Sequence, residues 1–362
     1  MSALASKIPA PEIGPPQPDR GGPLQPLLLV QGLRKHFRTK RSLLGRSSQV
    51  VRAVDDISFE LRKGHTLGIV GESGCGKSTT ARLLMHLIEP DAGTIVFDGD
   101  PVGTTRGLSL REMRRNMQMV FQDSYSSLNP RNQIVDIIAF PARIHGMPAG
   151  QAKERAEELL DQVGLRPTQF ARRYPHELSG GQRQRVNIAR ALALGPRLVI
   201  LDEAVSALDK SVEAQVLNLL ADLKQKLALS YIFISHDLNV VRHVSDRVLV
   251  MYLGQIVESG TTRSIYAAPR HPYTRALLSA VPTMDPERRT QIAPLTGDPP
   301  NPINPPSGCR FHTRCAFAEA VCSTAAPRMS LVEAASDHLA ACHMADPASG
   351  HSRSGEAGGG AP

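Results

Sequence analysis

The chain has 362 residues, of which 41% are hydrophobic and 21% charged, and a net charge of +8. This length allows two compact units, or one with an extension, and the basic charge suits phosphate ligands, nucleic acid or an anionic membrane face without choosing among them. No apolar run approaches the ~18–20 residues that span a bilayer, and no secretory signal is visible at the start, so we expect a chain that stays in the cytosol.

Both ends of the sequence have the composition of unstructured chain. Residues 1–26 contain seven prolines and little hydrophobic pattern, which predicts a disordered leader. Residues 345–362 are rich in Gly, Ser and Ala and predict a flexible tail. Two blocks lie between these ends, at about 27–268 and 269–344.

The first block alternates short apolar runs with helix-like segments. The helical patterns include Lys153–Val163 and Val212–Leu227. Runs that are apolar throughout and separated by helices indicate a parallel sheet buried on both faces, so the predicted fold class is α/β. The predicted strands are Thr66–Val70, Leu198–Leu201, Tyr231–Ser235 and Arg247–Met251.

The first of these strands leads into a glycine-rich loop that fits the pattern G-x-x-x-x-G-K-[ST] at every fixed position. A helical pattern, Thr79–Ile88, follows, which is the context this motif requires. The glycines let backbone N–H groups turn towards phosphates, and the helix N-terminus adds partial positive charge. We expect Lys77 to reach the β- and γ-phosphates of ATP and Ser78 to bind Mg²⁺, with Cys75 a small spacer. The loop reads Gly71-Glu72-Ser73-Gly74-Cys75-Gly76-Lys77-Ser78.

A second helix start with exposed backbone amides follows about a hundred residues later. Ser179 is a good N-cap, and the paired glycines leave the amides bare. Two anion sites for one nucleotide in one subunit would be redundant, so we expect the second to grip the ATP of another subunit. Two such chains would then clamp ATP at their interface, and loss of the γ-phosphate would loosen the clamp. The segment reads Leu178-Ser179-Gly180-Gly181-Gln182.

Polar residues at the ends of the predicted strands complete this constellation. Asp202 ends the strand before it and is placed to hold Mg²⁺, whereas Glu203 is placed as general base for an attacking water. His236 can contact the γ-phosphate or orient that water, and Gln122 can ligate Mg²⁺ or position water. Asp209 lies just beyond the acidic pair and can cross the same interface. Each of these residues, taken alone, is more often structural than catalytic.

The second block opens at His271-Pro272-Tyr273 and passes through a proline-rich segment to four cysteines. Their intervals of five, six and nineteen residues are longer than the C-x₂₋₄-C pairs typical of structural zinc. A [4Fe–4S] centre with looser spacing fits somewhat better, and zinc or four ordinary thiols remain open. Such a centre would be structural, because the block lies outside the ATP constellation. The cysteines are Cys309, Cys315, Cys322 and Cys342.

With these motifs, the chain from about 27 to 344 resembles the nucleotide-binding subunits of ATP-binding cassette (ABC) importers, in particular the dipeptide/oligopeptide group. The segment from Leu178 to Gln182 is highly specific to this superfamily. The resemblance implies that Phe37 stacks on adenine and that Gln122, Asp209 and His236 are the Q-loop, D-loop and switch-histidine residues. It also implies a helical subdomain at about 124–177 that touches the membrane partner, and some members of the group carry a [4Fe–4S] cluster.

The sequence departs from the family pattern at Ala204, where a proline usually follows the catalytic glutamate. Because proline would stiffen this turn, alanine there puts the hydrolysis rate in doubt but not the class of protein.

The resemblance implies an ATPase that drives import of a solute, with peptides ahead of nickel and glutathione. It also implies a second ATPase subunit, two membrane permeases and an extracytoplasmic solute-binding protein, so that the chain would lie peripherally on the cytoplasmic face of the membrane. The alternative is a nucleic-acid-acting ATPase of DNA repair or chromosome organisation. Such proteins carry coiled coils or zinc modules inside the cassette, and the stretch between Lys77 and Ser179 shows no sustained heptads. We therefore expect no nucleic-acid partner.

Overall fold

A computed structural model describes residues 22, 24–38, 49–105, 107–123, 125–280, 300–332 and 337–355. Most of the predicted leader and residues 356–362 of the predicted tail lie outside these ranges. The described chain divides into two compact units, residues 111–229 and residues 24–110 together with 230–355. The unit of residues 24–110 and 230–355 is described first.

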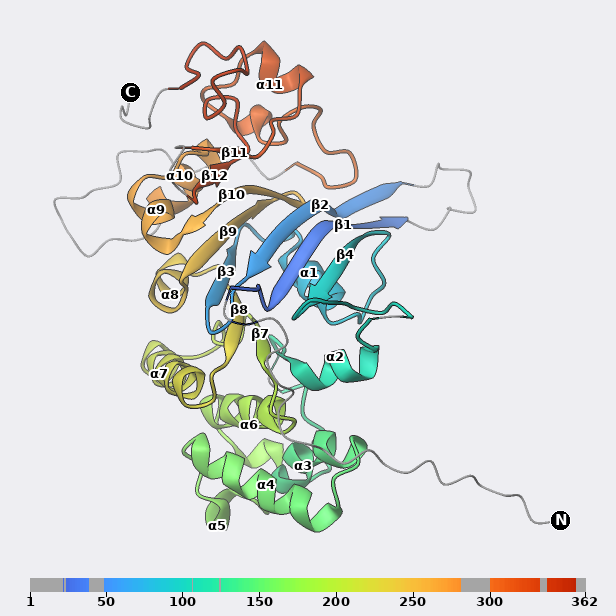
Figure 1. Ribbon diagram of the computed structural model, residues 1–362. Coiled ribbons are helices and arrows are strands. Elements are labelled where there is room, and N and C mark those ends of the chain that lie inside the picture. Colours follow the sequence, from blue (N-terminus) through green and yellow to red (C-terminus); the bar gives the residue numbers. More distant parts are fainter. Residues whose placement is uncertain are drawn as a thin grey trace, which may run out of the picture. The chain divides into compact units, whose positions relative to one another are not determined.

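An antiparallel sheet with the strand order β2-β1-β4-β5 opens this unit (Figure 1). Its strands are β1 (Leu28–Arg38), β2 (Val50–Leu61), β4 (Ala92–Phe97) and β5 (Asp100–Pro101). Leu28, Val30 and Leu33 of β1 are fully buried, whereas the strand's charged end is exposed. This sheet was not predicted from the sequence, because the charged residues of β1 interrupt its alternation of apolar and polar residues.

The same unit contains the strands β11-β12-β10-β9-β3-β8 in that order. β3 (Thr66–Val70) runs parallel to β8 (Ser230–Ile234) and to β9 (Arg247–Tyr252), and β3 and β8 are buried along their whole length. This is the burial on both faces that continuous apolar runs predict. β10 (Gln255–Thr261) pairs antiparallel with β9. The helices of this part are α1 (Lys77–Leu84), α8 (Leu238–Val244), α9 (Thr262–Ala267) and α10 (Pro272–Ser279).

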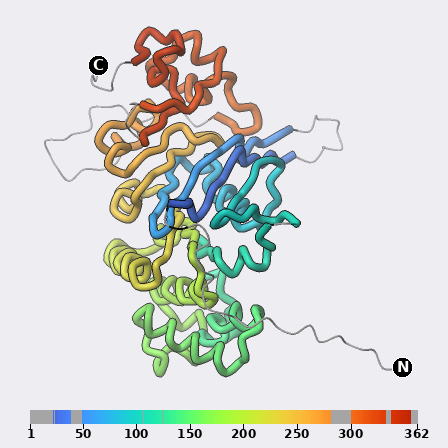
Figure 2. The backbone as a smooth tube through the Cα atoms, in the orientation of Figure 1, coloured from blue at the N-terminus to red at the C-terminus, as the bar shows by residue number. Residues whose placement is uncertain are grey.

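The C-terminal region is short of regular structure but is firmly packed. It contains η2 (His312–Arg314), α11 (Ala320–Thr324), β11 (Ser330–Leu331) and β12 (Leu339–Ala340), which pairs with β10. Its trace lies beside β10 in Figure 2, in red next to orange. His351 is buried and donates through Nε2 to the carbonyl of Phe317 at 2.9 Å. The extension therefore continues through residue 355, rather than giving way to a flexible tail at 345.

The other unit combines a parallel strand pair with most of the helices (Figure 1). β6 (Met117–Val120) runs parallel to β7 (Leu198–Asp202), with Met117 opposite Leu198. The helices α3 and α4 pack on each other and on α6, and Pro141 lies inside α3. The helical elements are α2 (Leu110–Asn116), α3 (Ile134–Ile144), α4 (Ala149–Gln162), α5 (Pro167–Phe170), η1 (Pro175–Glu177), α6 (Gly180–Leu192) and α7 (Lys210–Lys226).

The two predicted helices Lys153–Val163 and Val212–Leu227 correspond to α4 and α7, which begin four and two residues earlier. The first residue of the predicted helical subdomain, 124, lies outside the described ranges, and the subdomain's extent stays a prediction. Within the described residues, no helix is both long enough and apolar enough to cross a bilayer.

Candidate nucleotide site

The glycine-rich loop between β3 and α1 has two glycines at which a Cβ atom would collide with neighbouring backbone. Gly76, the N-cap of α1, has φ 110°, and a Cβ atom there would lie 2.3 Å from the carbonyl oxygen of Ala53. A Cβ atom on Gly71 would lie 2.2 Å from the carbonyl oxygen of Met251. Both glycines therefore let the loop pass directly against neighbouring backbone, which fixes its path.

Lys77 is buried inside the loop that it terminates. Its Nζ donates to the carbonyl oxygens of Gly71, at 2.7 Å, and Glu72, at 3.0 Å. An ammonium group with two carbonyl acceptors at the mouth of a helix N-terminus is suited to receiving phosphate oxygens in their place. Cys75 is 3% exposed, and burial raises the pKa of its thiol, as expected of a spacer rather than a nucleophile.

His236 follows β8 at the same sheet edge as this loop. β3 and β8 are parallel, with Ile69 opposite Ile234, and Ser235 N donates to the carbonyl of Ile69 at 3.3 Å. Because the carboxyl ends of parallel strands meet at one edge, the exposed His236 and the phosphate loop both emerge there. Ser78 and Thr79 lie in the first turn of α1, directly after Lys77.

Phe37 lies near the end of β1 with 40% of its surface exposed. The two residues before Phe37 are held by Asp91, which accepts from His36 N at 2.6 Å and pairs with Lys35 Nζ at 2.9 Å. Lys35 Nζ also lies 5.7 Å from the centre of the Phe37 ring. An exposed ring on a fixed strand can stack on a base, which is the role that the family resemblance implies.

Gln122 and Glu203 are brought together in the unit of residues 111–229. Gln122 Nε2 donates to Glu203 Oε2 at 2.9 Å, although the two are far apart in sequence. Glu203 has φ 49°, the left-handed conformation that is costly for a side chain with a Cβ atom and that clusters at functional sites. Asp202, at the end of β7, is 4% exposed. Ala204 is also buried, so the departure from the family pattern is accommodated by packing.

The start of α6 caps itself. Ser179 Oγ accepts from Gln182 N at 3.3 Å, and Ser179 N donates to Gln182 Oε1 at 3.0 Å, which makes a capping box. Gly180 has room for a Cβ atom, 3.6 Å from Leu208 Cδ2. A Cβ atom on Gly181 would lie 2.3 Å from Val212 Cγ1, so the close approach of α7 accounts for one of the two glycines.

Asp209 is the N-cap residue of α7, and its carbonyl accepts from Glu213 N at 2.8 Å. Its side chain makes no cap hydrogen bond and is exposed. The carboxylate thus faces solvent, as a residue that crosses an interface requires.

The four C-terminal cysteines line one narrow cavity of about 10 Å³, together with four histidines. Burial raises the pKa of the Cys309, Cys315 and Cys342 thiols to about 11. Within the described residues, no three His, Cys, Asp or Glu side chains form a ready metal-ion site. The cavity lining consists of His271, Pro272, Cys309, Phe311, His312, Cys315, Phe317, Cys322, Cys342, His343, Met344 and His351.

Two contacts to the phosphate loop were not predicted from the sequence. Tyr273 Oη accepts from Glu72 N at 2.8 Å, and Arg314 forms an ion pair with the Glu72 carboxylate at 2.8 Å. Both come from the C-terminal region, more than 200 residues away in sequence.

Two family models match the sequence: ABC transporter, over residues 54–206, and the C-terminal region of oligopeptide/dipeptide transporters, over residues 257–322. The chain is 51% identical over 323 residues to a probable peptide ABC transporter ATP-binding protein of Sinorhizobium fredii, covering 89% of this chain and 91% of that relative. The chain belongs to the ABC transporter ATP-binding proteins. As a member of that family it is an ATPase.

Other similar proteins agree with this family and with the fold. An oligopeptide transport ATP-binding protein of Bacillus subtilis is 50% identical, over 88% of this chain and 97% of the relative. A di/tripeptide transport ATP-binding protein of Pseudomonas aeruginosa is 45% identical, over 89% and 99%. Among solved structures, an ATP-binding cassette in a dimeric post-hydrolysis state with ADP and Pi has a TM-score of 0.56 and 26% identity, covering 65% of this ABC protein and 99% of that chain. The α/β prediction and the family resemblance are confirmed.

Proposed function

We propose that this ABC ATPase hydrolyses ATP to drive the import of di- or oligopeptides through separate membrane subunits. The observation that carries the proposal is the pairing, in one chain, of an ABC transporter region with the C-terminal region of oligopeptide/dipeptide transporters. The relatives in Bacillus subtilis and Pseudomonas aeruginosa are named for oligopeptide and di/tripeptide transport. The alternative, a nucleic-acid-acting ATPase, finds no support among these relatives.

We assign the following roles to the site residues. The loop Gly71–Ser78, with Lys77 and Thr79, receives the phosphates, and Phe37 stacks on the base. Ser78, Gln122 and Asp202 carry the hard oxygen atoms that would hold Mg²⁺, which would supply positive charge to offset that of the phosphates. Glu203 is the base that takes a proton from water, and Gln122 orients its carboxylate through the 2.9 Å hydrogen bond. His236 contacts the γ-phosphate.

Ser179, Gly180, Gly181, Gln182 and Asp209 act on the nucleotide of a second subunit. The open Cβ position of Gly180 and the exposed carboxylate of Asp209 support this assignment. Two membrane permeases and a solute-binding protein outside the membrane complete the transporter, with this ATPase on the cytoplasmic side. We expect the second ATPase to be a different chain of the same family.

Replacing the base tests the hydrolysis mechanism. Glu203→Gln keeps the hydrogen-bonding shape but cannot take a proton, so we expect turnover to fall about 10²–10⁴-fold with ATP binding retained. Phosphate release and binding of a fluorescent ATP analogue measure the two properties separately. Glu157→Gln, an exposed residue of α4, is the matched control. Unchanged turnover in Glu203→Gln would remove Glu203 as the base.

The transported solute is tested by assembly. Purification of the tagged chain in detergent should recover two permeases and a second ATPase, and vesicles containing this complex should take up labelled dipeptide or oligopeptide when ATP is supplied. Uptake of nickel or glutathione instead of peptide would contradict the proposal that the transported solute is a peptide. Salt-sensitive DNA binding by the purified chain would favour the nucleic-acid alternative.

We further propose that the four C-terminal thiols hold a metal centre, either [4Fe–4S] or zinc. Four cysteines around one buried cavity supply a complete thiolate set. The cavity has room for about one water-sized atom, so a four-iron cluster needs the sulfurs farther apart than they lie here. A sample purified without oxygen should be brown and contain iron and sulfide. A colourless protein without iron or zinc would end this proposal.

A further inference from the structure

Glu72, the second residue of the phosphate loop, is held by the C-terminal region at two points. Its N–H donates to Tyr273 Oη at 2.8 Å. Its carboxylate accepts two bonds from Arg314, at 2.8 Å from Nη1 to Oε2 and 3.1 Å from Nη2 to Oε1. The Arg314 side chain is only 5% exposed, so this bidentate ion pair is held in one geometry, unlike a mobile ion pair on the surface.

The groups that hold Glu72 are themselves tightly packed. The rings of Tyr252 and Tyr273 lie 4.6 Å apart, and both pack on Phe311, at 5.4 and 5.5 Å. Arg314 Nη1 also donates to Tyr252 Oη at 3.4 Å. A shift of this cluster would therefore move both contacts to the phosphate loop together.

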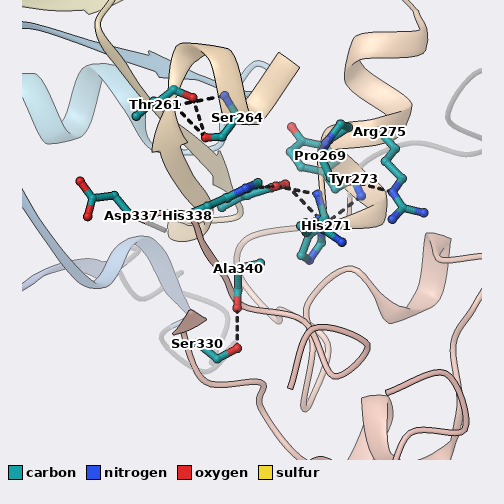
Figure 3. Close-up of polar contacts among 12 residues, drawn as sticks. Thr261, Ser264, Pro269, His271, Tyr273, Arg275, Ser330, Asp337, His338 and Ala340 are labelled. Atoms are coloured by element: carbon teal, nitrogen blue, oxygen red, sulfur yellow. Dashed lines mark hydrogen bonds and ion pairs between the residues drawn. The ribbon is translucent and has the colours of Figure 1, made fainter. Parts of the chain in front are cut away.

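The cluster is anchored in turn to β10 through a buried carboxylate. Glu258 is fully buried and accepts from the backbone N–H groups of Arg270, at 2.7 Å, and His271, at 3.0 Å. His338 Nε2 lies 2.7 Å from the same carboxylate, and Tyr273 N donates to His271 Nδ1 at 3.0 Å (Figure 3). A continuous set of hydrogen bonds thus runs from β10 to the backbone of the phosphate loop.

The charge of Glu72 gives this contact a consequence for nucleotide binding. The G-x-x-x-x-G-K-[ST] pattern leaves position 72 open, so the motif itself requires no acid there. A free carboxylate in a loop that receives a triphosphate would repel it. Arg314 offsets that negative charge at contact distance.

We propose that Arg314 is a positioning residue of the nucleotide site, which neutralises Glu72 and fixes the loop backbone so that the C-terminal region sets the affinity for ATP. This inference rests on the proposed nucleotide-binding role of the loop. It assigns to the C-terminal region a part in ATP binding in addition to any metal that its cysteines hold.

The test uses the full chain and measures KM and kcat for ATP together with direct binding of a fluorescent ATP analogue. Arg314→Ala should raise KM and the dissociation constant about fivefold, with little change in kcat, because an uncompensated charge opposes binding. Arg314→Lys should recover part of the loss. Adding Glu72→Gln to Arg314→Ala should bring KM back to within about twofold of the wild type, because the repelling charge is gone. Arg328→Ala, an exposed arginine of the same region, is the matched control and should change nothing.

Two results would overturn the inference. One is an unchanged KM in Arg314→Ala. The other is a raised KM that Glu72→Gln does not restore, which would mean that the arginine only supports the fold. If Arg314→Ala unfolds, Arg314→Gln is measured instead, alone and together with Glu72→Gln, and the same changes in KM test the inference. A wild-type chain that neither binds nor hydrolyses ATP would instead refute the proposed function, and the two failures are therefore distinguishable.

Discussion

The two glycine-rich helix starts of this chain are built in opposite ways. At α1 the cap residue is Gly76 in the left-handed region, with no side-chain cap, and the loop is shaped by distant parts of the chain. At α6 the cap is made within four residues by the reciprocal bonds of Ser179 and Gln182. The first start is therefore fixed by tertiary structure, and the second by its own sequence.

This difference matches what each start has to do. A loop that encircles a triphosphate needs a rigid backbone. Contacts with neighbouring backbone and with the C-terminal region hold this loop in place. A helix start that meets the nucleotide of a second subunit, as we propose for α6, must leave its amides uncovered. A cap that needs no outside partner leaves that face open.

The largest effect on stability is expected at the start of α1, which tertiary contacts fix. Gly76→Ala would place a Cβ atom 2.3 Å from backbone in a conformation that L-residues avoid, so we expect a loss of ~3 kcal/mol or more in the free energy of unfolding. Urea unfolding of the full chain measures it. Gly74→Ala is the matched control, because φ is also positive at 78° but no atom lies within 4 Å; we expect ~1 kcal/mol. Equal losses in the two variants would contradict the idea that contacts shape the loop.

The free energy of unfolding should also depend on pH, through the buried His271 beside Tyr273. Burial lowers the pKa of His271 to about 4 from 6.5, with Arg275 adding to the effect and Glu258 opposing it. Between pH 6.5 and about 4, His271 is therefore protonated in the unfolded chain but neutral in the folded chain. Stability should be complete above pH 6.5 and fall by ~2–3 kcal/mol as the pH drops towards 4. The free energy of unfolding measured across this window should have a shallower slope in His271→Gln than in the wild type; the same slope in both would rule out His271 as the source.

The smallest effect is expected at the self-capped start. Ser179→Ala removes one cap bond and should cost about 1 kcal/mol, whereas Ser179→Asp, which restores an acceptor, should recover most of it. Thermal unfolding at a fixed pH compares the three chains. If Ser179→Ala costs as much as Gly76→Ala, then α6 too depends on tertiary contacts, and the contrast between the two starts disappears.

The same contrast explains what could be predicted from the sequence. The strand Thr66–Val70 and the loop that follows it were predicted correctly, because a continuous apolar run and a fixed glycine pattern are local signals. The ion pair of Glu72 with Arg314 was not, since its partners are 242 residues apart and each is unremarkable in its own surroundings. The close approach of Val212 to Gly181 was missed for the same reason.

The antiparallel sheet around β1 was missed for a different reason. Its charged end, with Lys35 and His36, reads as a surface loop, and the register against β2 shifts at three points. Only the folded chain brings Asp91 to these residues and leaves Phe37 exposed beside them. The assignment of Phe37 to the base came from the family resemblance, and the geometry supplies its physical support.

The buried carboxylate of Glu258 has a consequence for how such proteins can be divided. It belongs to β10, yet its hydrogen-bond donors are Arg270, His271 and His338, all in the part of the chain that follows. A version truncated after β10 would keep this carboxyl group and lose the hydrogen-bond donors that satisfy it. The catalytic cassette and its C-terminal addition are therefore not interchangeable modules, and a chimaera that joins this cassette to another tail must change residue 258 at the same time.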